Sequence, residues 1–207
     1  GVYRDRTQLD RRRRGSRTVA ATCGLLGAAC AVAQNELLIR GESPSAGVME
    51  GLKAINSALT LACLASILYC YHLSAALHRL EAHIHRGAEL HVPLSWAQVL
   101  GKRRLWAEIL VCGVHLPPYI TFEIGTTNLT NFMLYRGETV LCAVNLLRVY
   151  LPWRVIRDCM LADLPRRYTV AAFANVELGS SFAIKRMLNS WFSLLYLAAL
   201  WALLVVL

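Results

Sequence analysis

Long, mostly apolar runs alternate with short basic stretches along this chain. A transmembrane helix needs about 20 largely apolar residues, so each run of about that length predicts a membrane span. The predicted spans are Thr18–Ile39, Ile55–Leu77, Leu105–Phe122, Val140–Met160 and Met187–Leu207. The fourth run is the least hydrophobic, because it contains three Arg and one Asp. The pattern predicts an all-α integral membrane protein.

The predicted spans divide the chain into four parts. The expected parts are a basic cytoplasmic N-terminal tail at 1–17, a four-helix transmembrane domain at 18–160, a helical cytoplasmic linker at 161–186 and a fifth transmembrane helix at 187–207.

Composition and charge agree with a membrane protein. Hydrophobic residues make up 56% of the 207 positions and charged residues 17%, whereas soluble domains have about 45–50% and about 25%. The net charge is +9. A nucleic-acid binder would gather that excess in a patch or stripe, but here it lies between the apolar runs, so no nucleic-acid partner is expected.

The basic residues also predict the orientation of the chain. Eighteen Lys and Arg fall in the N-terminal tail, the loop between the second and third spans and the region Arg154–Arg186, against three in the other two loops. Cytoplasmic loops are enriched in Lys and Arg, so we expect a multi-pass protein, in the plasma membrane, with a cytoplasmic N-terminus. Asn128-Leu129-Thr130 then lies in an external loop, where Asn128 is a candidate for N-glycosylation.

Charges inside the fourth span are the strongest candidates for function. An Arg at mid-membrane costs about 2.5–3.5 kcal/mol and is normally paired. Arg148, Arg154 and Arg157 are spaced by six and three residues, which places them on one face of a helix, and Glu108 in the third span is the expected partner. The pairing of Glu108 with Arg148 or with Arg154 stays open.

Two interpretations of this charge network are open. It could make 18–160 a voltage-sensor-like bundle, or it could be a static bridge that holds the helices in register. A gating helix needs several charges that move through the field. Here Arg148 is the one deep charge, Leu151 interrupts the row, and Pro152 weakens the helix. We therefore expect a sensor-like bundle that responds poorly to voltage.

Neither a catalytic site nor a metal centre is predicted. The chain has no Gly-rich phosphate loop and no G-x-S-x-G motif. His83 and His85 lack accompanying Cys residues, and their spacing matches no structural zinc pattern. All seven Cys fall within predicted spans, where they serve as small packing residues. We expect a non-enzymatic chain that binds no cofactor directly.

The linker after the fourth span has helical signals of its own. Asp163-Leu164-Pro165 is a helix-start signal, and two short helices are expected, at Arg166–Asn175 and Glu177–Lys185. In the first, Thr169, Ala172 and Phe173 share one face. That face could dock a groove-forming partner, or the helix could lie at the membrane interface.

Several stretches together carry a family resemblance. They are Glu108–Cys112 with His115 and Pro117, Leu147–Leu151 with Arg154-Val155, Thr169–Phe173, Phe182–Lys185 and Ser193–Leu207. These stretches resemble the third helix, fourth helix, linker and fifth helix of small- and intermediate-conductance calcium-activated potassium channels.

The resemblance implies a tetrameric channel that calcium gates through constitutively bound calmodulin, with little voltage dependence. Calcium would act through calmodulin rather than bind this chain. Thr169, Ala172 and Phe173 match the positions that contact the calcium-loaded N-lobe. Several positions depart from the family pattern. Phe173 stands where the family usually has Leu, Tyr168 where it has Arg, and Ala174-Asn175 where it has Asn-Lys.

The resemblance also implies parts that this chain does not contain. Potassium selectivity comes from rings of filter carbonyls, and no Gly-Tyr-Gly filter follows the fifth span. The expectation is a channel fragment, truncated at the start of the pore domain and not conducting as it stands. Its expected partners are calmodulin, other subunits of a homotetramer or related channel, and membrane lipid. The alternative is a pore-less membrane protein that regulates or anchors others.

Overall fold

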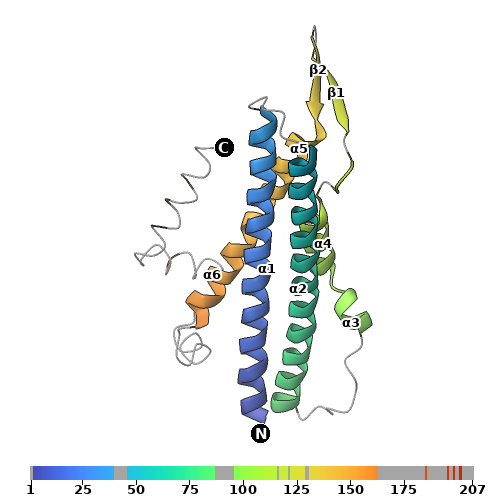
Figure 1. The fold of residues 1–207 in the computed structure, drawn as a ribbon. Helices are drawn as coiled ribbons and strands as arrows, with labels where there is room; N and C mark the ends of the chain where they lie inside the picture. The colour runs from blue at the N-terminus through green and yellow to red at the C-terminus, as the bar shows by residue number, and fades with distance from the viewer. Residues whose placement is uncertain are drawn as a thin grey trace. The chain divides into compact units, whose positions relative to one another are not determined.

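The computed structural model describes residues 2–39, 46–86, 96–115, 117–120, 122–128 and 131–162, together with four single helical positions, Lys185, Leu195, Ala198 and Trp201. The described elements are α1 (Val2–Ile39), α2 (Ala46–Arg86), α3 (Trp96–Leu100), α4 (Arg103–Gly113), β1 (Glu123–Asn128), β2 (Asn131–Arg136), α5 (Gly137–Leu146), the 3-10 turn η1 (Leu147–Val149) and α6 (Tyr150–Ala162) (Figure 1). The chain divides into two units, Gly1–Pro152 and Trp153–Leu207. The linker helices, with Thr169, Ala172 and Phe173, lie outside the described residues, as does most of the fifth predicted span.

Three helices are long and apolar enough to cross a membrane, which indicates a membrane protein. They are Arg6–Ile39, Gly47–Leu80 and Gly137–Cys159. They confirm the first, second and fourth predicted spans as helices of sufficient length. The first two contain 34 residues each, or about 51 Å of helix, which exceeds the roughly 30 Å hydrocarbon core. The part of α1 before Thr18, which carries the basic residues, belongs to the same continuous helix and extends beyond the hydrocarbon core.

The third segment is broken, so the prediction of one continuous span over Leu105–Phe122 is wrong. Its main helix, α4, has 11 residues, about 17 Å, which is too short to cross the membrane. The helix ends at Gly113, and Val114 is already extended. A proline has no N–H for an intrahelical hydrogen bond and disfavours helix in the residue before it, so Pro117-Pro118 prevents continuation. The predicted four-helix arrangement is therefore not confirmed among the described residues, which contain three helices long enough to span a membrane.

A β-hairpin lies between α4 and α5, where the sequence predicts the loop that joins the third and fourth spans of an all-α protein. β1 and β2 are antiparallel, with register Glu123↔Arg136 at one end and Asn128↔Asn131 at the other. The strands are rich in β-branched and aromatic residues, which favour extended structure. At the base of the hairpin, the Gly137 amide donates a hydrogen bond to the Phe122 carbonyl at 2.8 Å, which fixes where α5 begins.

The main core lies between α1 and α2, which run antiparallel and side by side (Figure 1). Their facing residues are mostly small. The buried apolar residues of these two helices include Ala20, Ala21, Ala28 and Ala31 on α1 and Cys63, Ile67 and Cys70 on α2. Small side chains allow two helix backbones to approach closely in a membrane. Large apolar side chains such as Leu26 and Leu61 are exposed, as expected for surfaces that face lipid.

Candidate functional site: the buried arginine of the helical bundle

Arg148 is fully buried, although it carries a charge in the middle of a membrane-spanning segment. It lies on η1, the 3-10 turn that joins α5 to α6, and its exposed fraction is 0%. Its Nη2 atom donates hydrogen bonds to the carbonyl oxygen of Cys112 at 2.7 Å and to that of Val114 at 3.2 Å. The bonds tie the fourth predicted span to the end of α4.

The two carbonyl acceptors exist because α4 stops where it does. The last carbonyls of a helix have no intrahelical N–H partner, and the C-terminal end of a helix carries partial negative charge. In a continuous helix the carbonyl of Val114 would accept from position 118, but Pro118 has no N–H. The broken third segment therefore presents main-chain carbonyl oxygens to the buried guanidinium of Arg148. The carbonyls need a hydrogen-bond donor, and the guanidinium needs acceptors.

The magnitudes explain how this charge can stay buried. Placing Arg at the bilayer centre costs about 2.5–3.5 kcal/mol. A hydrogen bond to a charged group contributes about 1.5–3 kcal/mol. Two such bonds are comparable to the cost, and both are made by Nη2, whereas Nε and Nη1 are buried without a hydrogen-bond partner among the described residues.

A polar side chain of α2 lies close to Arg148, and a second polar side chain is buried on α5. Asn56 on α2 and Asn145 on α5 are each 2% exposed. Thr60 donates its hydroxyl to the Asn56 carbonyl at 2.8 Å. Gly27 on α1 makes room for the group, since a Cβ there would lie 2.8 Å from Arg148 Nη1 and 3.0 Å from Asn56 Oδ1. α1, α2, α4 and α5–η1 therefore all contribute to one polar centre.

Glu108, the expected partner of the arginines, has a different contact. Tyr71 on α2 donates its hydroxyl to Glu108 Oε1 at 2.7 Å. Arg148 Nη2 bonds two main-chain carbonyls, and the pairing of Glu108 with Arg148 or with Arg154 stays a prediction. In the uninterrupted third helix expected from the sequence, main-chain carbonyl oxygens accept intrahelical hydrogen bonds, so these two were not expected as acceptors for the guanidinium.

The expected row of arginines is also altered. Its one-face geometry assumed α-helix throughout, but Arg148 lies on a 3-10 turn, which has three residues per turn. Pro152 falls in the first turn of α6, where the missing N–H is tolerated. Arg157 contacts its neighbour Asp158 at 3.4 Å within the second unit, and Arg154 lies on the same helix, α6.

A second buried ionic group lies where α2 and α5 meet the segment after α4. The Lys53 side chain is 4% exposed, and its Nζ atom lies 3.4 Å from Glu50 and 3.7 Å from Glu138. It also reaches the Ile120 carbonyl at 3.5 Å. Sequence reasoning assigned Lys53 to a loop. The spacing of Glu50 and Lys53, three residues apart, was the available signal that both lie on one helix.

Glu50 extends this group. Its Oε2 atom accepts a hydrogen bond from the backbone amide of Tyr119 at 2.7 Å. Tyr119 has a φ of 65°, in the left-handed region that non-glycine residues rarely adopt. The carboxylate therefore fixes a tight turn immediately after Pro117-Pro118. Glu50 and Lys53 together connect α2 to the segment after α4 and to the start of α5.

The other predicted sites are only partly described. Asn128 is the last residue of β1 and pairs with Asn131. All seven cysteines are free, and Cys159 alone among them is exposed. Among the residues that the structure describes, no group of three or more His, Cys, Asp or Glu side chains is arranged to hold a metal ion.

The geometry points to a fixed charge and not to a reactive one. Arg148 has main-chain acceptors, small neighbours and complete burial, which suits holding helices in register. No protein-family model matches the chain, and no curated protein matches it.

Proposed function

We propose that this chain is the membrane part of a calcium-activated potassium channel subunit, located in the plasma membrane with its N-terminus in the cytoplasm. Calcium gates the channel through calmodulin, which acts on the linker after the fourth span. Voltage contributes little. The observation that carries the proposal is the static anchoring of Arg148 in a bundle of membrane-spanning helices.

The anchoring of Arg148 supports weak voltage dependence. A charge that crosses the field gains about 2.3 kcal/mol per 100 mV. To move, Arg148 would have to give up its bonds to Cys112 and Val114, worth about 1.5–3 kcal/mol each. A single deep charge held in this way favours a bundle that serves as scaffold, so that another signal has to open the pore.

The linker supplies the second part of the proposal. Thr169, Ala172 and Phe173 share one helical face by their spacing. A small patch with one aromatic residue, between basic flanks, suits the apolar groove of a calcium-loaded sensor protein. The resemblance in this segment is the support for calmodulin as that protein. In the assembled channel, four linkers would couple calmodulin to the pore.

The alternative is a pore-less membrane protein that regulates or anchors others through the same bundle. The β1–β2 hairpin favours it, because the hairpin extends beyond α1 and α2 in the first unit (Figure 1). The sheet has two strands among the described residues, and an open strand edge can pair with a strand of a partner protein.

Calmodulin binding by the full chain tests the channel proposal. The purified chain in lipid nanodiscs is titrated with fluorescent calmodulin, in calcium and in a calcium chelator. We expect tighter binding in calcium and a loss of at least about tenfold in affinity for Ala172→Asp/Phe173→Asp, since two charges would enter an apolar contact.

Ala171→Asp is the matched control. Position 171 lies on the opposite side of the helix from the 169/172/173 face, so a carboxylate added there should leave binding unchanged. Equal binding with and without calcium, or equal losses in both variants, would remove calmodulin from the proposal and favour the pore-less alternative.

A further inference from the structure

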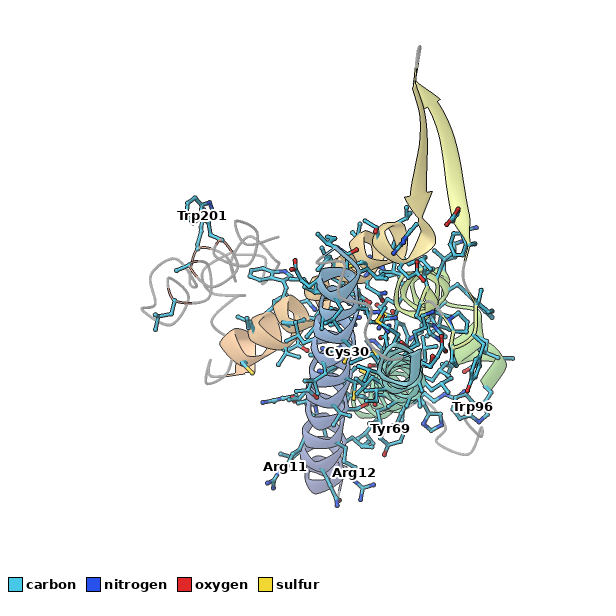
Figure 2. The ribbon with its side chains drawn as sticks, turned by 45° about the horizontal axis from the view of Figure 1, so that its top comes forward. Arg11, Arg12, Cys30, Tyr69, Trp96 and Trp201 are labelled. Carbon is cyan, nitrogen blue, oxygen red and sulfur yellow. The ribbon has the colours of Figure 1, made fainter. Side chains whose placement is uncertain are left out.

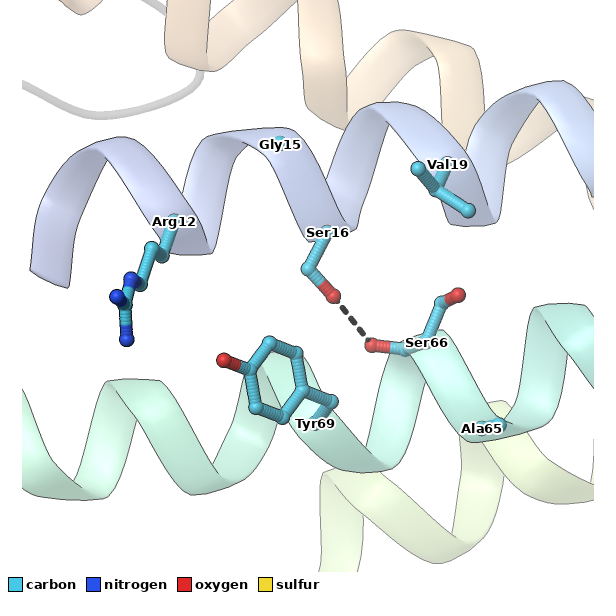
Figure 3. Close-up of a pocket in the computed structure, with 7 residues that line it drawn as sticks. All are labelled: Arg12, Gly15, Ser16, Val19, Ala65, Ser66 and Tyr69. Atoms are coloured by element: carbon cyan, nitrogen blue, oxygen red, sulfur yellow. Dashed lines mark hydrogen bonds between the residues drawn. The ribbon is translucent and has the colours of Figure 1, made fainter.

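A groove of about 510 Å³ runs between α1 and α2 toward the N-terminal end of α1. Figure 3 shows Arg12 and Tyr69 at one end of the groove and Val19 and Ala65 at the other. Its volume falls within the range of about 300–1,000 Å³ that is usual for ligand pockets. The groove therefore has a cationic end and an apolar end.

The cationic end carries charge that the residues described in the structure do not neutralise. Arg13 and Arg14 share the carboxylate of Asp10. Arg12 is exposed, and no acidic partner for it is found in the described parts of the chain. Figure 3 shows the Arg12 side chain extending from α1 toward α2, with the Tyr69 ring beside it. A guanidinium at this place can form a bidentate contact with a phosphate group.

The rest of the groove suits an acyl chain. The Ser16 hydroxyl donates to the Ser66 carbonyl at 2.7 Å, so the polar groups in the middle of the groove bond each other. Val19 is 49% exposed. A Cβ added to Gly15 would meet no atom within 4 Å, which shows that the space there is open. The groove thus offers small and apolar surface beyond its charged end.

The position in the membrane agrees with this polarity. Arg12 precedes the apolar segment Thr18–Ile39 by less than two helical turns, whereas Tyr69 lies within the uncharged run Ile55–Leu77. An arginine near the end of a span extends its side chain to the membrane–water interface, and tyrosine is enriched at that interface. The groove crosses from the headgroup level into the hydrocarbon.

We propose that this groove binds one phospholipid with an anionic headgroup, supplied by the leaflet at the N-terminal end of α1. The lipid phosphate contacts Arg12, and an acyl chain lies along Gly15, Val19 and Ala65. Charge complementarity selects the headgroup, and the open apolar floor accepts the chain. The site is independent of the proposed channel function.

The test counts bound lipid directly. The full chain is reconstituted in bilayers of equal parts phosphatidylserine and phosphatidylcholine, released into mild detergent and examined by native mass spectrometry. We expect one retained phosphatidylserine. Arg12→Gln should lower its retention about fivefold, the effect of one cation near an anionic surface. Gly15→Leu should abolish retention of either lipid by filling the groove.

Two controls match these variants. Arg11 is exposed on the same helix and points in another direction from Arg12 (Figure 2), so Arg11→Gln should retain the lipid. Gly51 on α2 also borders open space, since a Cβ added there would meet no atom within 4 Å, and it does not line the groove. Gly51→Leu should therefore retain the lipid.

Several results would overturn the proposal. Equal losses in Arg11→Gln and Arg12→Gln would mean diffuse attraction by the basic helix. Retention in Gly15→Leu would place the lipid elsewhere. If inorganic phosphate displaced the lipid, the groove would be a binding site for free phosphate and not for a phospholipid. A lipid-free dimer that Gly15→Leu dissociates would make a second copy the occupant.

Discussion

At the scale of single residues, Arg148 depends on where a neighbouring helix ends. Its two acceptors, the carbonyls of Cys112 and Val114, are free for it because α4 stops before Pro117. The sequence was sufficient to predict a deep, buried arginine. It did not predict the acceptors, because main-chain oxygen atoms are not visible as residue types and the third span was taken as continuous.

Gly27 is predicted to be needed for this centre. In Gly27→Ala the new Cβ would approach Arg148 Nη1 at 2.8 Å, so the guanidinium has to shift. We expect a loss of about 1–3 kcal/mol in the free energy of unfolding, the usual cost of overpacking. Reversible unfolding of the purified chain in mixed micelles measures it.

Gly51→Ala is the matched control for that substitution. A Cβ at Gly51 has no neighbour within 4 Å, and alanine is the better helix former by about 0.5–1 kcal/mol. The control should be unchanged or slightly more stable. If Gly27→Ala behaves in the same way, the crowding around Arg148 is not a constraint on the bundle.

Lys53 should couple energetically to Glu138. The two charged atoms lie 3.7 Å apart, and the Lys53 side chain is 4% exposed, so water screens the pair little. A double-mutant cycle with Lys53→Met and Glu138→Gln should give a coupling free energy of about 0.5–3 kcal/mol, as for contacting residues. Additive single effects would mean that the contact contributes nothing to stability.

At the scale of elements, long uncharged runs were the reliable signal. They predicted the apolar parts of α1, α2 and α5–α6, but they did not predict that α1 extends through the basic residues. Arg is a good helix former, and Asp10 supports Arg13 and Arg14 at spacings of three and four. Because residues 1–17 are basic, they were predicted to form a tail separate from the first span. Basic residues determine where a segment lies relative to the membrane, but they do not prevent it from being helical.

The hairpin was missed for a related reason. The segment after Pro117-Pro118 was treated as the loop between two spans, and its strand propensity was not considered. β-propensity depends strongly on context, and the contact that fixes the hairpin, from Gly137 to Phe122, is formed only when α5 begins there.

The prolines after α4 are predicted to maintain the arginine site. In Pro117→Ala/Pro118→Ala the new N–H groups can bond the carbonyls of residues 113 and 114, so α4 can lengthen and Arg148 loses an acceptor. We expect more helix by circular dichroism and a loss of about 1–3 kcal/mol in unfolding free energy.

Pro152→Ala serves as the comparison, because Pro152 lies in the first turn of α6, where its missing N–H is tolerated. It should change helix content little. Unchanged stability in the 117/118 variant would show that the end of α4 does not determine how Arg148 is held.

At the scale of the whole molecule, orientation can be tested at the hairpin. Each strand has six residues, about 20 Å, so Asn128 lies at the end of the hairpin farthest from Gly137. We expect glycosylation of Asn128 when the chain is made with microsomes, and its loss in Asn128→Gln. An unmodified chain whose N-terminus is protease-protected inside the microsomes would reverse the orientation.

If the bundle holds its deep charge fixed, Arg148 should stay bonded to Cys112 and Val114 when the membrane potential changes. Charge displacement in voltage-clamped cells that carry the chain at their surface measures this. We expect no saturating displacement above that of cells without the chain. A saturating, voltage-dependent displacement that Arg148→Gln removes would contradict that expectation and make Arg148 a gating charge.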